Sequence, residues 1–354
     1  MQLTTSTVIK KLLVLFLVVA GLYYAKDFLM PLAIGGVFAT LFLPLCKWME
    51  KHKVPKILAA LACLLLLLAG IAGVGALLGW QIAGLMKDID LISKKVTETG
   101  TRVQEYIFNN LGISVKEQSQ ILKDEQPSLT GVIQFVAGSL TALFSNAILV
   151  AVYILMLLYY RIHIKNFIIK LTSPPQRGEM EKVIYRTGKV SQQYLLGLIK
   201  MIGCLWIMYG IGFSLLGVKN AFFFAILCGL LEVVPFIGNI TGTSLTVLVS
   251  AAQGAGLPVL GGIVAIYGVV QFIQGWLLEP LILGPQVKIN PLFTIIALVL
   301  GGLIWGIPGV FLAIPLTAML KIVCDHVEPL KPLGFLIGEL ESPKKTDDLI
   351  KKGK

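Results

Sequence analysis

One carboxylate lies inside an apolar stretch that is long enough to span a membrane. Glu232 is the only charged residue between positions 221 and 250, and Pro235 follows it in the run GLLEVVPFIGN. A charge near the middle of a span costs at least about 2.5–3.5 kcal/mol on insertion scales. Glu232 must therefore face protein or water, or be protonated. A carboxyl so placed can exchange a proton, bind a cation or accept hydrogen bonds from a solute.

Pro235 is expected to break the helix that carries this carboxylate. Proline lacks the backbone donor and clashes with the carbonyl four residues earlier, and lipid offers that carbonyl no partner. Gly238, Asn239 and Thr241 follow directly in the sequence. This polar patch could satisfy the broken backbone and contact a solute. Two interpretations stay open: a kinked helix whose glutamate bonds a neighbouring span, or a site that binds a solute or an ion.

A second segment repeats this pattern 73 residues later. GLLEVVP at 229–235 is echoed by GLIWGIP at 302–308, which ends in Pro308. Paired spans interrupted by glycine and proline are a sequence pointer to the central site of a transporter. Chance similarity between two apolar helices is the alternative. We predict two broken helices that line one pathway.

More polar residues fall between the two broken segments. Gln271 and Gln274 follow Tyr267 at i+4 and i+7, so all three share one helix face. Amides are costly in lipid, and the two glutamines are therefore expected either to bridge spans or to line a pathway. Glu279 and Asn290 belong to EPLILGPQVKINP, which we interpret as an external loop or a partly inserted connection.

Enzyme and cofactor motifs are not found in the sequence. It contains no H-E-x-x-H, P-loop or G-x-S-x-G motif, and its five cysteines are scattered without a C-x-x-C pair. We therefore expect neither catalysis nor a cofactor or metal. Because no ATP-binding motif is present, transport would have to be driven by a gradient, by mass action or by a separate partner.

The elements that must position these residues are membrane helices. The 354 residues are 56% hydrophobic and only 14% charged, which is too apolar for a soluble protein of this size. We predict an all-α polytopic membrane protein with about eight transmembrane helices, two of them broken by Gly and Pro, and a small external helical layer. The predicted spans are 9–26, 28–46, 57–80, 134–160, 196–217, 221–250, 258–279 and 292–322.

The distribution of charge predicts the orientation of these spans. KWMEKHKVPK, after the second span, has four lysines, and residues 161–200 have eight Lys or Arg against two Glu. Residues 83–130 are balanced, with six basic and seven acidic groups. Basic segments stay cytoplasmic, so we place both termini inside. The net charge of +11 then reflects topology and lipid headgroups, and not nucleic-acid binding.

The same reasoning divides the chain into five segments. They are an N-terminal three-span unit (1–81), an external helical segment (82–130), a fourth span with a cytoplasmic amphipathic helix (131–195), a four-span transport core (196–325) and a cytoplasmic tail (326–354).

The sequence from YLLGLIKMIG to LTAMLKIV resembles the autoinducer exporter family, or PerM-type permeases. The P-[FY]-[IV]-G core of that family is matched by PFIG at 235–238, and its later E-P and N-P pairs by Glu279 and Asn290 with the prolines that follow. Its final G-x-x-G and A-x-P are matched at 306–309 and 313–315. The chain departs from the family at Asn239, where proline is frequent, and at Leu198, where glutamine is frequent. Both departures bear on which solute is transported, and neither changes the resemblance to the family.

The resemblance implies a bacterial inner-membrane transporter of eight spans that forms a homo-oligomer. Members export a furanosyl quorum-sensing signal, and others exchange sodium or lithium for protons. The polar groups of this chain fit export of a small polar solute, and Glu232 fits cation/proton antiport. A passive channel is the third alternative. The partners implied are therefore a solute or cation, the lipid bilayer and further copies of the chain.

Overall fold

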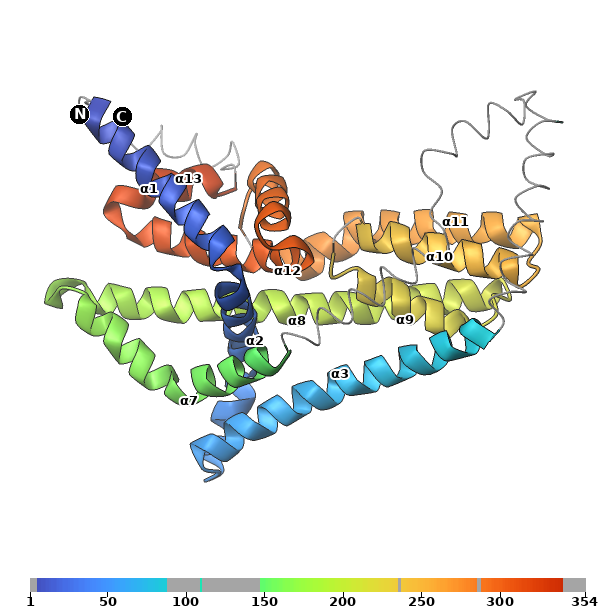
Figure 1. Cartoon of the computed structure of the whole chain (residues 1–354), viewed down its shortest axis with the longest axis horizontal. Helices are drawn as coiled ribbons and strands as arrows, with labels where there is room; N and C mark the ends of the chain where they lie inside the picture. The colour runs from blue at the N-terminus through green and yellow to red at the C-terminus, as the bar shows by residue number, and fades with distance from the viewer. Residues whose placement is uncertain (1–4, 88–108, 110–146, 235–236, 285–287, 340–354) are drawn as a thin grey trace, which may run out of the picture. The chain divides into compact units, whose positions relative to one another are not determined.

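The computed structural model describes residues 5–87, 109, 147–234, 237–284 and 288–339 (Figure 1). These stretches fold almost entirely as helices. The longer helices are α1 (Thr5–Tyr24), α2 (Lys26–Lys51), α3 (Lys56–Lys87), α7 (Ala147–Leu171), α8 (Arg177–Leu215), α9 (Ala221–Leu231), α10 (Ile237–Ala252), α11 (Leu257–Ile273), the π-helix η2 (Gln274–Leu283), α12 (Pro291–His326) and α13 (Lys331–Ile337). The all-α prediction is confirmed.

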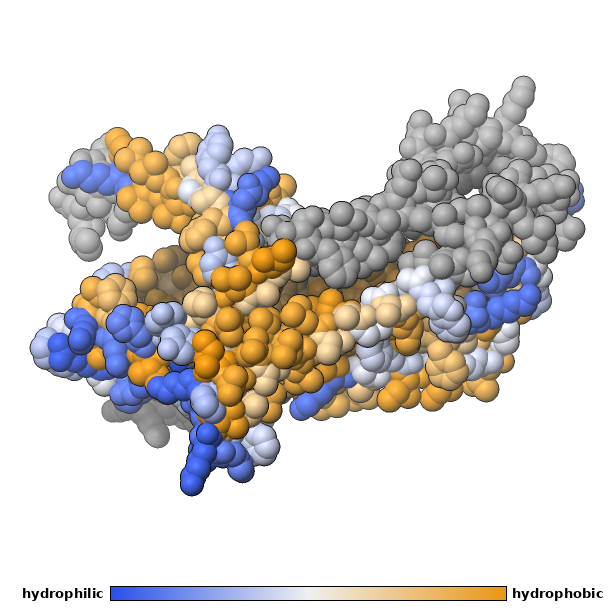
Figure 2. Space-filling view, turned by 60° about the horizontal axis from the view of Figure 1, so that its bottom comes forward, coloured by the Kyte–Doolittle hydropathy of each residue, from blue (hydrophilic) through white to orange (hydrophobic). Residues whose placement is uncertain are grey.

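The length and composition of these helices are those of a multi-pass membrane protein. Within the described residues, six helical stretches are long and apolar enough to cross a bilayer, and two shorter apolar helices accompany them. Hydrophobic residues cover much of the face seen in Figure 2. Phe16, Ile207 and Leu303 are among the large apolar side chains that are exposed. Such a surface is stable only where lipid replaces water as the solvent.

Helices from distant parts of the sequence pack as two compact units. Unit 1 comprises residues 1–65, 147–197 and 281–354, and unit 2 comprises residues 66–146 and 198–280. Since each unit combines stretches far apart in the chain, neither equals one of the five segments predicted from sequence. Those segment boundaries remain a prediction.

In unit 1, α2 packs closely against α7. A Cβ on Gly35 would lie 2.8 Å from the Cβ of Tyr153, so only glycine lets the two helices approach this far. Thr40 of α2 donates a hydrogen bond to Ser191 of α8 over 3.0 Å. The indole of Trp305 in α12 donates to the carbonyl of Leu22 in α1. The contact between Trp305 and Leu22 joins helices from near the two ends of the chain within unit 1.

In unit 2, the second half of α8 packs with α9 and α11. The Trp206 indole donates to the Ile226 carbonyl over 3.1 Å. Gly212 of α8 faces Ile266 of α11, and Gly262 of α11 faces Leu216, the residue directly after α8. α10 lies against both α9 and α11. The polar residues singled out from the sequence between 232 and 279 all belong to this unit.

Two helices extend beyond the spans predicted at 57–80 and 196–217. The helix of the third span continues beyond Trp80 to Lys87. The helix predicted at 176–195 follows a turn at Pro174–Gln176 and runs without interruption into the fifth span as the 39-residue α8. The rest of the predicted external layer lies outside the described residues, as does the start of the fourth span.

The chain reverses direction at the first predicted break. α9 and α10 pack as an antiparallel hairpin, with Gly242 of α10 against Cys228 of α9. At the turn, a Cβ on Gly238 would lie only 1.7 Å from the Leu231 carbonyl oxygen. The 11 residues of α9 rise about 16 Å, which is too short for a hydrocarbon core of about 30 Å. The break predicted in 221–250 is therefore confirmed, but it forms a hairpin and not a kinked single crossing.

The second predicted break has the same form. Gly306 has φ 64° and ψ −142°, and it divides α12 into two helices. These halves run antiparallel, because a Cβ on Gly309 would meet the Gly301 carbonyl oxygen at 1.9 Å. Pro308 lies in the first turn of the second half, where a missing N–H costs nothing. The prediction of a break is confirmed, but glycine makes it and not proline.

The first residues of one expected loop are helical in the structure. Glu279 and Pro280, which we assigned to an external loop or a partly inserted connection, lie within the π-helix η2. Helices with this wider turn are rare and often occur at functional sites. Pro280 would disrupt an α-helix, and here it lies within the π-helix.

Candidate functional site

A buried hydrogen-bond network surrounds Glu232 at the end of α9. Glu232 is 7% exposed, and its Oε1 accepts a hydrogen bond from Nε2 of Gln274. Gln274 is 3% exposed, and its Oε1 accepts from Nδ2 of Asn239 over 3.3 Å. Asn239 itself is fully buried near the start of α10. Three elements therefore converge on one buried amide, that of Gln274.

The network continues along α11. Asn239 Nδ2 also donates to Gln271 Oε1 over 3.3 Å, and Gln271 Nε2 donates to the hydroxyl of Tyr267 over 3.3 Å. The shared face predicted for Tyr267, Gln271 and Gln274 is confirmed by these contacts. We call Glu232, Asn239, Tyr267, Gln271 and Gln274 the polar cluster.

A polar stripe on α10 extends this cluster. Asn239, Thr243, Thr246 and Ser250 follow at i, i+4, i+7 and i+11, and all four are buried. The Thr246 hydroxyl donates to the Gly242 carbonyl of its own helix over 2.8 Å. Across the described residues, Glu232 Oε2, Asn239 Oδ1 and Thr243 Oγ1 are buried without a hydrogen-bond partner.

These unpartnered oxygens define what the cluster can bind. A buried acceptor left without a donor costs about 1–3 kcal/mol, so a ligand that donates to it gains that energy. Carboxylate and amide oxygens accept hydrogen bonds and also coordinate hard cations. In the described part of the chain, no group of three or more His, Cys, Asp or Glu is placed to hold a metal ion. Hydroxyl-bearing solutes and small cations are the ligands that this chemistry fits.

The remaining predicted residues near the cluster are placed less centrally. Glu279 is exposed, and its Oε1 lies 3.4 Å from Gln274 Nε2. Thr241 is half-buried and lies two positions beyond Asn239, on another side of α10. Gly238 is buried at the hairpin turn. Pro235 lies outside the described residues, so its predicted proximity to Pro308 remains a prediction.

Asn290 has a structural position in unit 1. Its Oδ1 accepts from the Phe293 amide and caps the start of α12. Its Nδ2 donates to the carbonyls of Leu336 and Gly338, which fastens the C-terminal helix α13 to α12. All polar atoms of its side chain are thereby used within the protein. A place for Asn290 in a pathway is therefore not supported by its contacts.

Sequence reasoning missed three residues of this region: Tyr209, Thr246 and Ser250. The last two follow Asn239 and Thr243 at helical spacing, so the i, i+4, i+7, i+11 pattern in 237–252 was a usable signal. Tyr209 is fully buried in α8, and its hydroxyl lies near Thr243 without a hydrogen bond of regular geometry in the described residues. Nothing in the local sequence of α8 distinguishes this tyrosine from others in the span.

The fold and the site together define a multi-pass membrane protein with a polar site buried among its helices, which is the arrangement of a transporter. Residues 12–328 match the family described as AI-2E family transporter. The chain belongs to this family, which confirms the resemblance found in the sequence.

Bacterial relatives cover nearly the same length. Two bear the name "Putative transport protein": YueF of Bacillus subtilis, 26% identical over 82% of this chain and 82% of its own, and YhhT of Escherichia coli, 24% identical over 95% of both chains. The AI-2 transport protein TqsA of Escherichia coli is 22% identical over 92% of this chain and 94% of its own.

Proposed function

We propose that this chain exports a small polar solute across the bacterial inner membrane, driven by a gradient, and binds it at the polar cluster and the adjoining polar stripe of α10. The observation that carries the proposal is the group of buried oxygens without donors: Glu232 Oε2, Asn239 Oδ1 and Thr243 Oγ1. A solute with several hydroxyl groups can donate to all of them. The furanosyl autoinducer has this chemistry, and the name of TqsA favours it as the first solute to test.

Two threonines on one face of α10 offer a matched pair for the test. Thr243→Val removes a hydroxyl that lies near Tyr209 and Cys228 but makes no hydrogen bond of regular geometry in the described residues, whereas Thr246→Val removes one that already donates to the Gly242 carbonyl. Valine keeps the shape in both cases. We expect Thr243→Val to raise the concentration for half-maximal export several-fold, by the loss of roughly one hydrogen bond. Thr246→Val should transport as the wild type does.

The measurement is solute counterflow in proteoliposomes with purified protein. Accumulation of labelled solute against its gradient identifies a carrier, and downhill leakage alone identifies a passive channel. Equal losses in the two threonine variants would contradict binding at the polar cluster, since both would then act only through packing.

Sodium or lithium exchange for protons is the second candidate. Glu232 favours this exchange, because its deeply buried carboxylate could be shared by a proton and a cation. Glu232→Gln keeps the shape and the hydrogen bonding but removes the titration. For an antiporter, this variant should assemble normally and lose the pH dependence of flux. An unchanged pH profile in Glu232→Gln would end the antiport alternative and leave solute export.

A further inference from the structure

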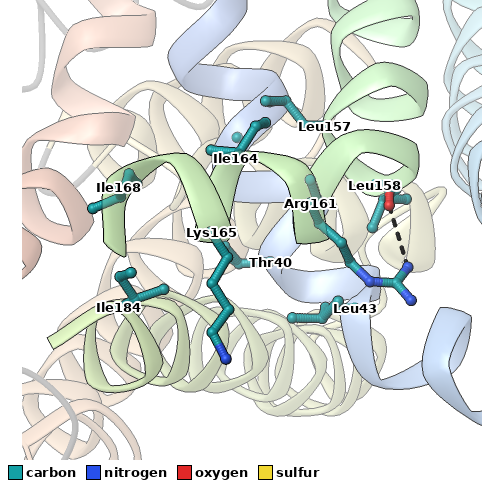
Figure 3. Close-up of a pocket in the computed structure, with 11 residues that line it drawn as sticks. Thr40, Leu43, Leu157, Leu158, Arg161, Ile164, Lys165, Ile168 and Ile184 are labelled. Carbon is teal, nitrogen blue, oxygen red and sulfur yellow. Dashed lines mark hydrogen bonds between the residues drawn. The ribbon is translucent and has the colours of Figure 1, made fainter. Parts of the chain in front are cut away.

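Unit 1 contains a cavity of about 220 Å³ between α2, α7 and the first half of α8 (Figure 3). Its walls are mostly aliphatic and include Leu43, Leu157, Ile168 and Ile184. Gly36 lies on the α2 side, where the lack of a side chain leaves room. A water-filled space would not be stable against such walls, so the cavity suits an apolar group.

Two cations border this apolar space. Arg161 and Lys165 lie one turn apart on α7 and both line the cavity, as Figure 3 shows. Each is also paired with a carboxylate on another helix, Arg161 with Glu50 of α2 and Lys165 with Glu181 of α8. These pairs hold the two cationic groups beside the cavity.

Lys165 retains capacity for an anionic ligand. Its side chain is 40% exposed and Glu181 is 57% exposed, so their ion pair contributes little on its own. An ammonium has three donors, and Glu181 uses one of them. Arg161 is more enclosed, at 17% exposed, and donates further to the Leu158 carbonyl and to Cys46 Sγ. Lys165 is therefore the direct donor, and Arg161 adds to the positive potential.

We infer that this cavity is a binding site for an anionic phospholipid, with an acyl chain between α2 and α7 and the phosphate at Lys165. The ligand must combine an apolar chain with a negative head, and the bilayer supplies that combination. Residues 161–200 carry eight Lys or Arg against two Glu, and such basic segments attract anionic lipids. A zwitterionic lipid would bring its own ammonium next to the two cations.

The test compares lipids that differ only in the headgroup. Purified full-length protein in detergent is titrated with phosphatidylglycerol or with phosphatidylcholine of the same chains, and Tm is followed. We expect phosphatidylglycerol to raise Tm at lower concentration. Lys165→Gln should weaken this effect about fivefold, as for one basic residue at an anionic surface. Lys170→Gln is the matched control, because this lysine lies on the same helix outside the cavity.

A second variant tests the apolar half of the site. A Cβ at Gly36 would meet only Leu157 Cδ1, at 3.8 Å, so Gly36→Leu can fill the cavity without displacing the backbone. It should fold and lose the stabilisation by phosphatidylglycerol. Equal stabilisation by phosphatidylcholine, an unaltered titration in both variants, or full stabilisation by inorganic phosphate would overturn the inference.

Discussion

Gln274 is the residue on which the polar cluster depends, because both ends of its amide are engaged. Its Nε2 donates to Glu232, and its Oε1 accepts from Asn239. The carboxylate and the asparagine come from α9 and α10, while Gln274 begins η2. A single amide thus connects the hairpin of α9 and α10 to η2, which follows α11. Since the contacts with Glu232 and Asn239 are buried, their loss cannot be replaced by water.

Gln274→Leu should therefore destabilise the protein and impair transport. The substitution leaves Glu232 Oε1 buried without this donor, at a cost of about 1–3 kcal/mol. Gln271→Leu is the matched control, because Gln271 is only half-buried and bonds the tyrosine hydroxyl and Asn239. We expect a clearly lower Tm for Gln274→Leu than for Gln271→Leu. The reverse order would show that Gln274 does not hold the cluster together.

At the scale of elements, the hairpins explain where the polar residues lie. The sequence predicted both breaks correctly, because glycine and proline within an apolar run indicate an interrupted helix. It could not predict the reversal of the chain, since a kink and a turn share the same composition. The close approach of Gly301 and Gly309 decides between them, and it is a contact between backbones that no side-chain pattern reports.

The turn of α12 should depend on Gly306 and not on Pro308. With φ 64° and ψ −142°, Gly306 occupies a region that is nearly closed to other residues, so Gly306→Ala should cost about 1–3 kcal/mol. Pro308→Ala should cost less than about 1 kcal/mol, through the greater freedom of the unfolded chain. Thermal unfolding of the two purified variants measures the difference. A larger loss in Pro308→Ala would restore proline as the cause of the break.

The turn between α9 and α10 should be equally sensitive at Gly238. A Cβ there would lie 1.7 Å from the Leu231 carbonyl oxygen, so Gly238→Ala must move the backbone next to Glu232. We expect a loss of at least about 1–3 kcal/mol, together with reduced transport. Gly268→Ala in α11 is the control, because no atom lies within 4 Å of its added Cβ. A helix-interior alanine there should stabilise by roughly 0.5–1 kcal/mol.

At the scale of the whole molecule, composition was sufficient to predict a multi-pass membrane protein. It was insufficient to predict how the helices pack. Hydropathy identified the membrane helices, and helical spacing placed Gln271 and Gln274 together. The two units could not be predicted, because each is assembled from stretches far apart in the chain. For the same reason the contacts of Asn290 could not be predicted: its partners Leu336 and Gly338 lie more than 40 residues away, in and directly after a short helix.

Orientation in the membrane is the prediction that concerns the whole chain. Residues 83–130 carry balanced charge and should lie outside, whereas the basic first part of α8 should lie in the cytoplasm. Single cysteines at Thr97 and Glu179, in a protein whose five native cysteines are replaced, test this with a membrane-impermeant thiol reagent. In intact spheroplasts we expect Thr97→Cys to be labelled and Glu179→Cys to be protected until the membrane is opened. Each helical hairpin can enter and leave the bilayer on one side, so the number of helices does not determine on which side Thr97 and Glu179 lie. The charge asymmetry alone predicts their sides. Labelling of both positions from the same side would overturn the proposed orientation.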